Sequence, residues 1–193
     1  RSRAVAGTAA LNQMNANAAA RLFMQAAESD WDNPYYTGRA FLAYLVAARV
    51  ADAATIAQHL VDLDSQNELA RLTLGVVALK QRRYASAIQE LGRVPDQSLI
   101  GVTAGILNSW AYVGNGNVPA AEREMNRLSE GGFDEFLVFH RALMADIAGN
   151  RAEAVRYARE AHEFDPFVPR IAEAYIRILA NAGQFDVAQE TLD

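Results

Sequence analysis

The segment Ala148-Gly149-Asn150-Arg151-Ala152-Glu153-Ala154 decides the fold of this chain. It joins a turn signal, glycine beside asparagine, to alanine-rich flanks of the kind that form helices. The same pattern returns at Ala182-Gly183-Gln184-Phe185-Asp186-Val187-Ala188 and at Asn115-Gly116-Asn117-Val118-Pro119-Ala120-Ala121. The pattern therefore predicts a repeated helix-turn-helix unit.

Three weaker copies extend the repeat toward the N-terminus, at residues 81–87, 47–53 and 14–20. Every copy ends on an alanine, and these six are Ala20, Ala53, Ala87, Ala121, Ala154 and Ala188. The steps between them are 33, 34, 34, 33 and 34 residues. Because alanine lets helix backbones approach, we expect Ala87 and Ala121 to be buried at helix crossings, where leucine would overpack.

Each unit is predicted to hold two helices, because apolar residues recur at spacings of three and four between the turns. Twelve helices should result, with hairpin turns near 15–17, 48–51, 82–84, 115–118, 149–151 and 183–185. Pro95 arrives early in its unit, so the helix before it should lose about one turn. No strand pattern is present.

This organisation predicts an all-α fold, a right-handed α-solenoid of about six repeats in one domain, residues 1–193. The units run approximately over 1–33, 34–67, 68–101, 102–134, 135–168 and 169–193. The first unit is rich in alanine and leucine, and the last helix stops before its unit is complete. We therefore expect the chain to be a fragment of a longer repeat protein, since terminal repeats usually carry a polar outer face.

The units resemble the tetratricopeptide repeat family, whose repeats are about 34 residues long. The family pattern has a small residue at the eighth place, an aromatic residue at the eleventh, alanine at the twentieth and a bulky residue at the twenty-fourth. Residues that match these places include Gly75, Ser109, Ala142, Tyr44, Tyr112, Met24, Leu91, Met125 and Leu192. Departures from the pattern include Phe41 and Ile176, which are large at the eighth place, and Ala78 and Ala145, which replace the aromatic residue.

The resemblance implies that the first helix of each unit lines a concave groove. The inner places hold the residues of a predicted partner groove: Leu42, Leu45, Leu72, Val76, Leu79, Ile106, Trp110, Val113, Phe136, Phe139 and Leu143. In the last unit they change to Arg170, Glu173, Arg177 and Ala180. Family members that clamp a carboxylate place lysine, asparagine and arginine at these sites, so this groove should instead bind an apolar or amphipathic segment. The alternative is that packing within the array buries these side chains.

Composition excludes several other functions. The net charge of −5 argues against nucleic acid as a partner, and no apolar run is long enough to span a bilayer. The chain has no cysteine, and its three histidines share no metal-ligand spacing. We find no catalytic motif, and we expect no enzyme activity, no cofactor and no metal. The compartment stays open between bacterial cytoplasm and periplasm.

The predicted function is therefore a protein-protein interaction scaffold. Its partner would be another protein, a further part of the same parent chain or a second copy in a homodimer. The alternative is a structural spacer or dimerisation segment of a larger repeat protein. The two hypotheses differ in whether the apolar inner face is open, and Trp110 is the residue we expect to anchor a partner.

Overall fold

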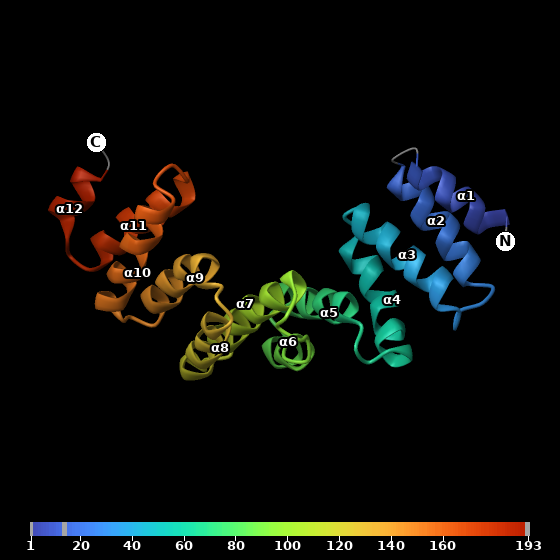
Figure 1. The fold of residues 1–193 in the computed structure, drawn as a ribbon, viewed down its shortest axis with the longest axis horizontal. Coiled ribbons are helices and arrows are strands. Elements are labelled where there is room, and N and C mark those ends of the chain that lie inside the picture. Colours follow the sequence, from blue (N-terminus) through green and yellow to red (C-terminus); the bar gives the residue numbers. More distant parts are fainter. Residues whose placement is uncertain (1, 13–14, 192–193) are drawn as a thin grey trace. The chain divides into compact units, whose positions relative to one another are not determined.

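The computed structural model describes residues 2–12 and 15–191, and every regular element in them is a helix. Twelve helices follow one another as hairpins, as Figure 1 shows. They are α1 Ser2–Asn12, α2 Ala16–Ala27, α3 Pro34–Val46, α4 Val50–Leu63, α5 Glu68–Lys80, α6 Tyr84–Leu91, α7 Leu99–Gly114, α8 Val118–Glu130, α9 Asp134–Ile147, α10 Arg151–Phe164, α11 Pro169–Asn181 and α12 Phe185–Glu190. The predicted all-α architecture is thus confirmed.

The hairpin turns lie where the repeated signature predicts them. At the signature glycines Gly116, Gly149 and Gly183, φ lies between 76° and 79°, a left-handed conformation that ends the first helix of a pair. Where the glycine is lost, Ala48 and Arg82 adopt the same conformation, with φ of 56° and 57°. The first turn lies partly outside the described residues, as do Met14 of the first copy and Leu192 of the last unit.

Asparagine has a separate role, at the starts of helices. The side chains of Asn67 and Asn117 accept hydrogen bonds from the backbone N–H groups of Ala70 and Ala120, at 3.0 and 3.2 Å. These bonds satisfy donors that the first turn of a helix leaves without a partner. In the signature copies that contain both residues, as at Gly116 and Asn117, the glycine therefore ends one helix and the asparagine starts the next, whereas Asn67 caps the first helix of its unit.

The alanine that ends each copy of the signature is buried in all six units. The exposed fraction is zero for Ala20, Ala53, Ala87 and Ala154, 1% for Ala121 and 7% for Ala188. These residues lie on the second helix of each hairpin, in the register that the spacing predicts. Small side chains are needed there because two helix backbones approach closely.

One unit departs from the others around Pro95. Helix α6 has only 8 residues, whereas the second helices α4, α8 and α10 have 13 or 14, so the loss exceeds the predicted single turn. Helix α7 compensates by starting at Leu99, three residues before the predicted start of its unit at Val102. The 33- and 34-residue spacing survives because the shorter helix is followed by a longer one.

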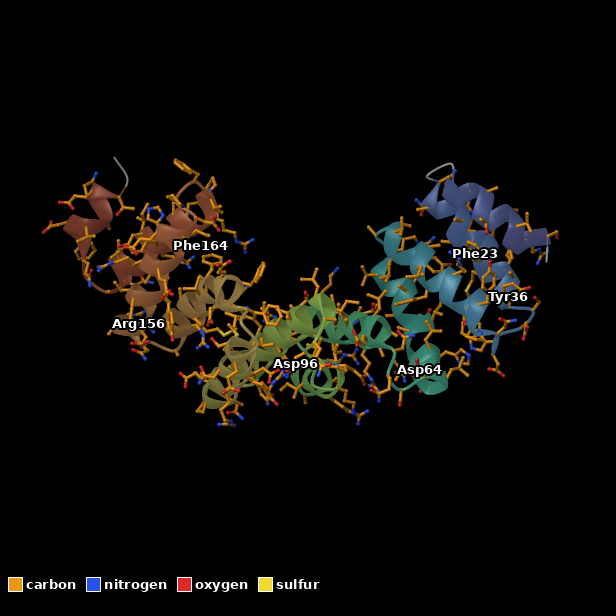
Figure 2. All side chains as sticks on the ribbon, viewed as in Figure 1. Phe23, Tyr36, Asp64, Asp96, Arg156 and Phe164 are labelled. Atoms are coloured by element: carbon orange, nitrogen blue, oxygen red, sulfur yellow. The ribbon has the colours of Figure 1, made fainter. Side chains whose placement is uncertain are left out.

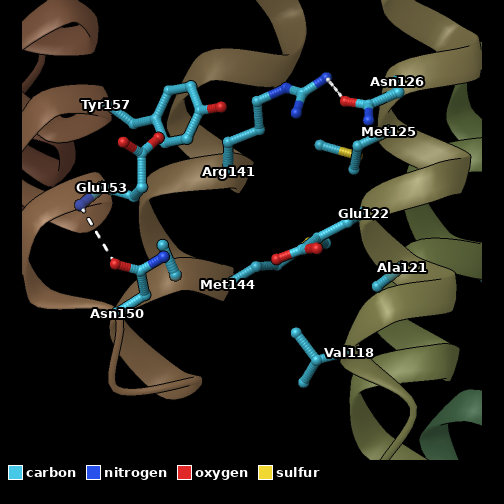
Figure 3. A pocket seen from close by; sticks show the side chains of 11 residues that line it. Val118, Ala121, Glu122, Met125, Asn126, Arg141, Met144, Asn150, Glu153 and Tyr157 are labelled. Atoms are coloured by element: carbon cyan, nitrogen blue, oxygen red, sulfur yellow. Dashed lines mark hydrogen bonds between the residues drawn. The ribbon is translucent and has the colours of Figure 1, made fainter.

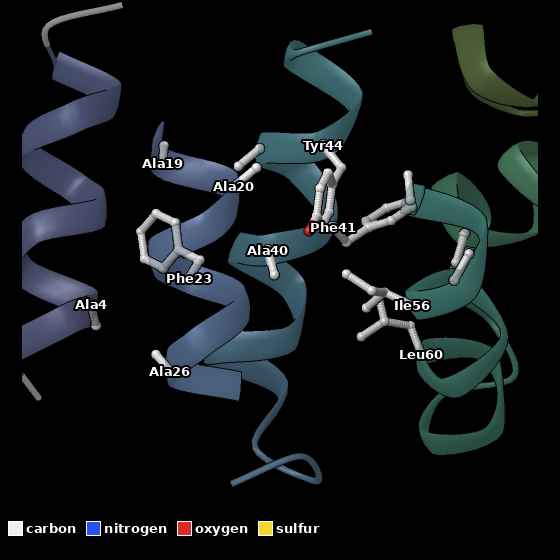
Figure 4. Close-up of a cluster of buried hydrophobic side chains, with 14 of the residues drawn as sticks. Ala4, Ala19, Ala20, Phe23, Ala26, Ala40, Phe41, Tyr44, Ile56 and Leu60 are labelled. Carbon is white, nitrogen blue, oxygen red and sulfur yellow. The ribbon is translucent and has the colours of Figure 1, made fainter. Parts of the chain in front are cut away.

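The helices group into two compact units, Arg1–Ala104 and Gly105–Asp193, and the boundary falls within α7. In the N-terminal unit, Phe23, Phe41 and Ile56 form part of an apolar core between α2, α3 and α4, drawn in Figure 4. In the C-terminal unit, buried clusters form around Met125 and Leu137 and around Ile178, Leu179 and Tyr175. That residues 1–193 act as one domain stays a prediction.

Candidate functional site

Six of the eleven predicted groove residues belong to the C-terminal unit. Helix α7 carries Ile106, Trp110 and Val113, and α9 carries Phe136, Phe139 and Leu143. None of the six is fully buried: Phe136 is 61% exposed and the other five are half-buried. These side chains thus stay accessible within their unit, and their role as a binding surface stays a prediction.

The Trp110 side chain is held in place by a hydrogen bond and by packing against neighbouring side chains. Its indole Nε1–H donates a hydrogen bond of 3.1 Å to Nδ1 of His140, and the two rings meet edge to face at 6.2 Å. One side of Trp110 packs on the cluster that contains Met125 and Leu137. The residue is therefore neither a core tryptophan nor a freely rotating one, because packing and the hydrogen bond orient a ring that remains half-exposed.

The hydrogen bond from Trp110 requires a neutral His140, because a protonated Nδ1 cannot accept it. Burial, followed by the positive charge of Arg170, lowers the pKa of His140 below its ordinary value. The folded-state pKa is therefore lower than the unfolded value of about 6.5. The stability that His140 contributes is present above about pH 6.5 and is lost as the pH falls through the folded-state pKa.

We expect the free energy of unfolding to drop between about pH 7.5 and about pH 5.5, more steeply in the wild-type chain than in His140→Gln. Glutamine keeps an acceptor for Trp110 but does not titrate in this range. Urea denaturation at the two pH values measures the difference. An equal drop in both proteins would show that His140 does not contribute.

The N-terminal unit contains the other five predicted groove residues. Leu42 on α3 is exposed, and Leu45 packs on the core cluster of that unit. On α5, the remaining three, Leu72, Val76 and Leu79, are half-buried. As in the C-terminal unit, these apolar side chains are partly buried but remain partly accessible to solvent.

Helix α11 carries charged residues at the corresponding predicted inner positions. Arg170, Glu173 and Arg177 are exposed, as their charge suggests. At the end of α9, Asp146 forms an ion pair with Arg151 and accepts hydrogen bonds from Asn181. The apolar surface of the C-terminal unit is therefore bounded by charged groups toward its last hairpin.

A second feature of the C-terminal unit is a hollow that sequence reasoning missed. It has a volume of about 220 Å³ and opens between α8 and α10, with α9 as its floor (Figure 3). The lining residues are Val118, Ala121, Glu122, Met125, Asn126, Arg141, Met144, Ala145, Asn150, Glu153 and Tyr157. Met125 and Met144 are buried there, whereas Glu122 and Asn126 are exposed at the rim.

Charged groups surround the apolar floor of the hollow. Arg141 donates a hydrogen bond of 3.0 Å to Asn126 and lies over the Tyr157 ring, 5.7 Å from its centroid. A hydrogen bond from Arg156 lowers the pKa of Glu153, so this carboxylate is ionised and paired. Glu122 makes no ion pair within the part of the chain that the structure describes. The hollow thus offers an apolar floor with one free carboxylate at its rim.

Among the described residues, no group of three or more histidine, aspartate or glutamate side chains is placed to hold a metal ion. Within the same residues, no helix combines the length and the apolar character needed to cross a membrane.

Comparison with solved structures supports the repeat architecture. A tetratricopeptide repeat protein from Parabacteroides merdae matches 98% of this chain over 76% of its own length, with a TM-score of 0.82 and 11% identity. PilW, a type IV pilus biogenesis factor, matches 98% over 88% of its length, with a TM-score of 0.76 and 13% identity. No family model and no curated protein matches the sequence.

A thermophilic tetratricopeptide repeat protein of Thermus thermophilus is also similar, with a TM-score of 0.63 and 16% identity over 93% of this chain and 98% of its own. This chain has the tetratricopeptide repeat fold. Identities this low show the fold and leave the partner undetermined.

The hollow lies beside a departure from the tetratricopeptide repeat pattern. Tyr44, at the eleventh place of its repeat, packs in the core of the N-terminal unit. Ala145 occupies the same place of its own repeat and lines the hollow. Ala78 also replaces the aromatic residue at this place and is buried, so the departure at Ala145 marks the position of the hollow but does not by itself predict it.

The hollow changes the expected cost of enlarging two of the repeated alanines. Ala87→Leu should lower the free energy of unfolding by about 1–3 kcal/mol, because the extra atoms have no space. Ala121→Leu should cost less, since Ala121 lines the hollow and its new methyl groups can enter it. Thermal or urea denaturation of both variants tests this order, and a larger loss for Ala121→Leu would contradict it.

Proposed function

We propose that this chain is a protein-interaction scaffold whose apolar inner faces bind an apolar or amphipathic segment of another protein. The observation that carries the proposal is that all eleven inner residues remain partly accessible within their units. Leaving apolar surface in water costs about 25 cal/mol per Å². Accessible apolar side chains that gather in this way within a unit are therefore typical of a site that a partner covers.

Trp110 supports the same proposal. Tryptophan is enriched among the residues that dominate interface energies. Here the ring is oriented before any partner arrives, by its hydrogen bond to His140 and by its packing on the Met125 cluster. Such preorganisation lowers the entropy that binding would otherwise cost.

The spacer hypothesis makes the opposite prediction for the same residues. In a spacer, the inner side chains contribute only to packing, so a charge placed on them would change stability without changing any binding. The two functions therefore separate when binding and stability are measured on the same variants.

The test starts from segments selected by the full chain from a random peptide library, with affinities measured by calorimetry. Leu72→Glu and Trp110→Glu should each weaken binding at the corresponding unit by about tenfold or more. Leu63→Glu and Phe185→Glu are matched controls, because they place the same charge on exposed apolar residues of second helices. Circular dichroism should show unchanged helical content in all four variants.

Two results would overturn the proposal in favour of the spacer. One is a selection that yields no segment dependent on the folded chain. The other is a set of segments whose affinity is insensitive to both inner-face variants but falls with the controls.

A further inference from the structure

We propose that two copies of this chain associate by inserting the Phe167 ring of one copy into the hollow beside Ala145 of the other. Both features lie in the C-terminal unit, on the α10–α11 loop and on α9. The contact uses neither Trp110 nor any of the eleven apolar inner residues, and it shares only the exposed Arg170 with the predicted inner positions. It is therefore independent of the proposed scaffold function.

The hollow has the size and chemistry of a site for a phenyl ring. Its volume is about 220 Å³, and an apolar cavity of about 150 Å³ already accommodates benzene. Its lining includes Met125 of α8 and Met144 and Ala145 of α9, and Figure 3 shows the two methionines beside it. Thioether sulfur atoms make favourable contacts with aromatic rings. In the tetratricopeptide repeat pattern, the place that Ala145 occupies is held by an aromatic residue.

Phe167 is a suitable occupant because nothing in its own chain covers it. It is 95% exposed, more than any other large apolar side chain among the described residues. Phe164 and Val168 beside it are also exposed, and Figure 2 shows Phe164 where α10 ends. Pro166 and Pro169 restrict the backbone on both sides of Phe167, so ordering this loop on binding should cost little entropy.

The geometry of the hairpin requires the ring to come from a second copy. Helix α10 runs antiparallel to α9, so the loop after Phe164 lies near the start of α9 at Asp134. Ala145 lies eleven residues further along that helix, a rise of about 16 Å at about 1.5 Å per residue. Phe167 accordingly does not occupy the hollow of its own unit and stays 95% exposed.

The charges around the two features are complementary. Arg170, three residues after Phe167, is exposed and forms no ion pair within the described residues. Glu122 at the rim of the hollow is likewise exposed and forms no ion pair there. Asp165 lies two residues before Phe167, and Arg141 lines the hollow together with Glu122. The loop thus carries one acidic and one basic residue beside the ring, and the hollow carries one of each, so Arg170 can pair with Glu122 and Asp165 with Arg141 in the proposed contact.

Because the ring and the hollow lie on different surfaces, the contact is head-to-tail. The full chain should then form open chains whose average mass, measured by light scattering, rises as the concentration approaches about 1 mM. Phe167→Ser removes the ring, and Ala145→Tyr fills the hollow. Each variant alone should stay a monomer, with association weakened by at least about tenfold, and helical content and Tm should show that both fold.

Mixing the two variants gives the decisive measurement. The Ala145→Tyr chain still presents a ring and the Phe167→Ser chain still presents a hollow, so one productive junction can form. The equimolar mixture should therefore contain dimers and no larger species. A wild-type chain that stays monomeric at about 1 mM, or a mixture that stays monomeric, would overturn the proposal.

Cross-linking tests the same contact independently, because the chain has no cysteine of its own. A mixture of Asn126→Cys chains, with a thiol at the rim of the hollow, and Val168→Cys chains, which keep the Phe167 ring, should form a disulfide-linked dimer faster than a mixture of Asn126→Cys and Phe185→Cys chains. Phe185 is also well exposed in the C-terminal unit, at 68%, and serves as the matched control. Equal rates in the two mixtures would contradict insertion of Phe167.

Discussion

Glu90→Leu is expected to lower the free energy of unfolding by about 3–5 kcal/mol, because it leaves a buried guanidinium without its counter-charge. The Arg71 side chain on α5 is only 4% exposed and donates a hydrogen bond of 2.7 Å to Glu90 on α6. A second bond of 2.7 Å joins Arg71 to the Ser65 carbonyl. Arg71 thereby ties the α4–α5 loop to both helices of the next hairpin.

The double variant Arg71→Met/Glu90→Leu is the control for this prediction. It removes both charges and keeps similar volumes, so most of the lost stability should return. Urea denaturation of the wild-type chain, the two single variants and the double variant gives the coupling energy directly. If the double variant is as unstable as the sum of the two single variants, the charges are not coupled and the loss has another origin.

Gly101→Ala is expected to lower the free energy of unfolding of the N-terminal unit by more than about 1–3 kcal/mol, the usual cost of overpacking a buried site. A Cβ at this position would lie 1.8 Å from the Pro95 carbonyl oxygen and 2.7 Å from Cα of Asp96. Both are backbone atoms, so no side-chain rotation relieves the overlap. The first turn of α7 is held in this position because the Ser98 hydroxyl oxygen accepts a hydrogen bond of 3.0 Å from the Gly101 N–H.

Gly38→Ala provides a matched control, because Gly38 also lies in a helix but has open space where its Cβ would be. Alanine there should stabilise the chain by about 1 kcal/mol or less, through its higher helix propensity. Thermal denaturation should therefore shift in opposite directions for the two glycines. A stabilising Gly101→Ala would mean that the Pro95 segment moves away without cost.

The sequence by itself determined the number of helices, the places of the turns and the register of the buried alanines. These features depend on local chemistry. A glycine such as Gly149 adopts the left-handed conformation, an asparagine such as Asn150 caps the next helix, and a recurring alanine such as Ala154 permits a close crossing. Each effect acts within a few residues, so the order of residues along the chain is enough to predict it.

Only the tertiary structure decided which side chains are covered and which spaces stay open. Arg71 becomes a buried residue because Glu90 and Ser65, 19 residues after it and 6 before it, meet its guanidinium. Ala145 leaves a hollow because no neighbouring helix moves in to replace the missing ring. Burial and cavities depend on contacts between helices that are distant in sequence, and the repeat spacing alone does not specify those contacts.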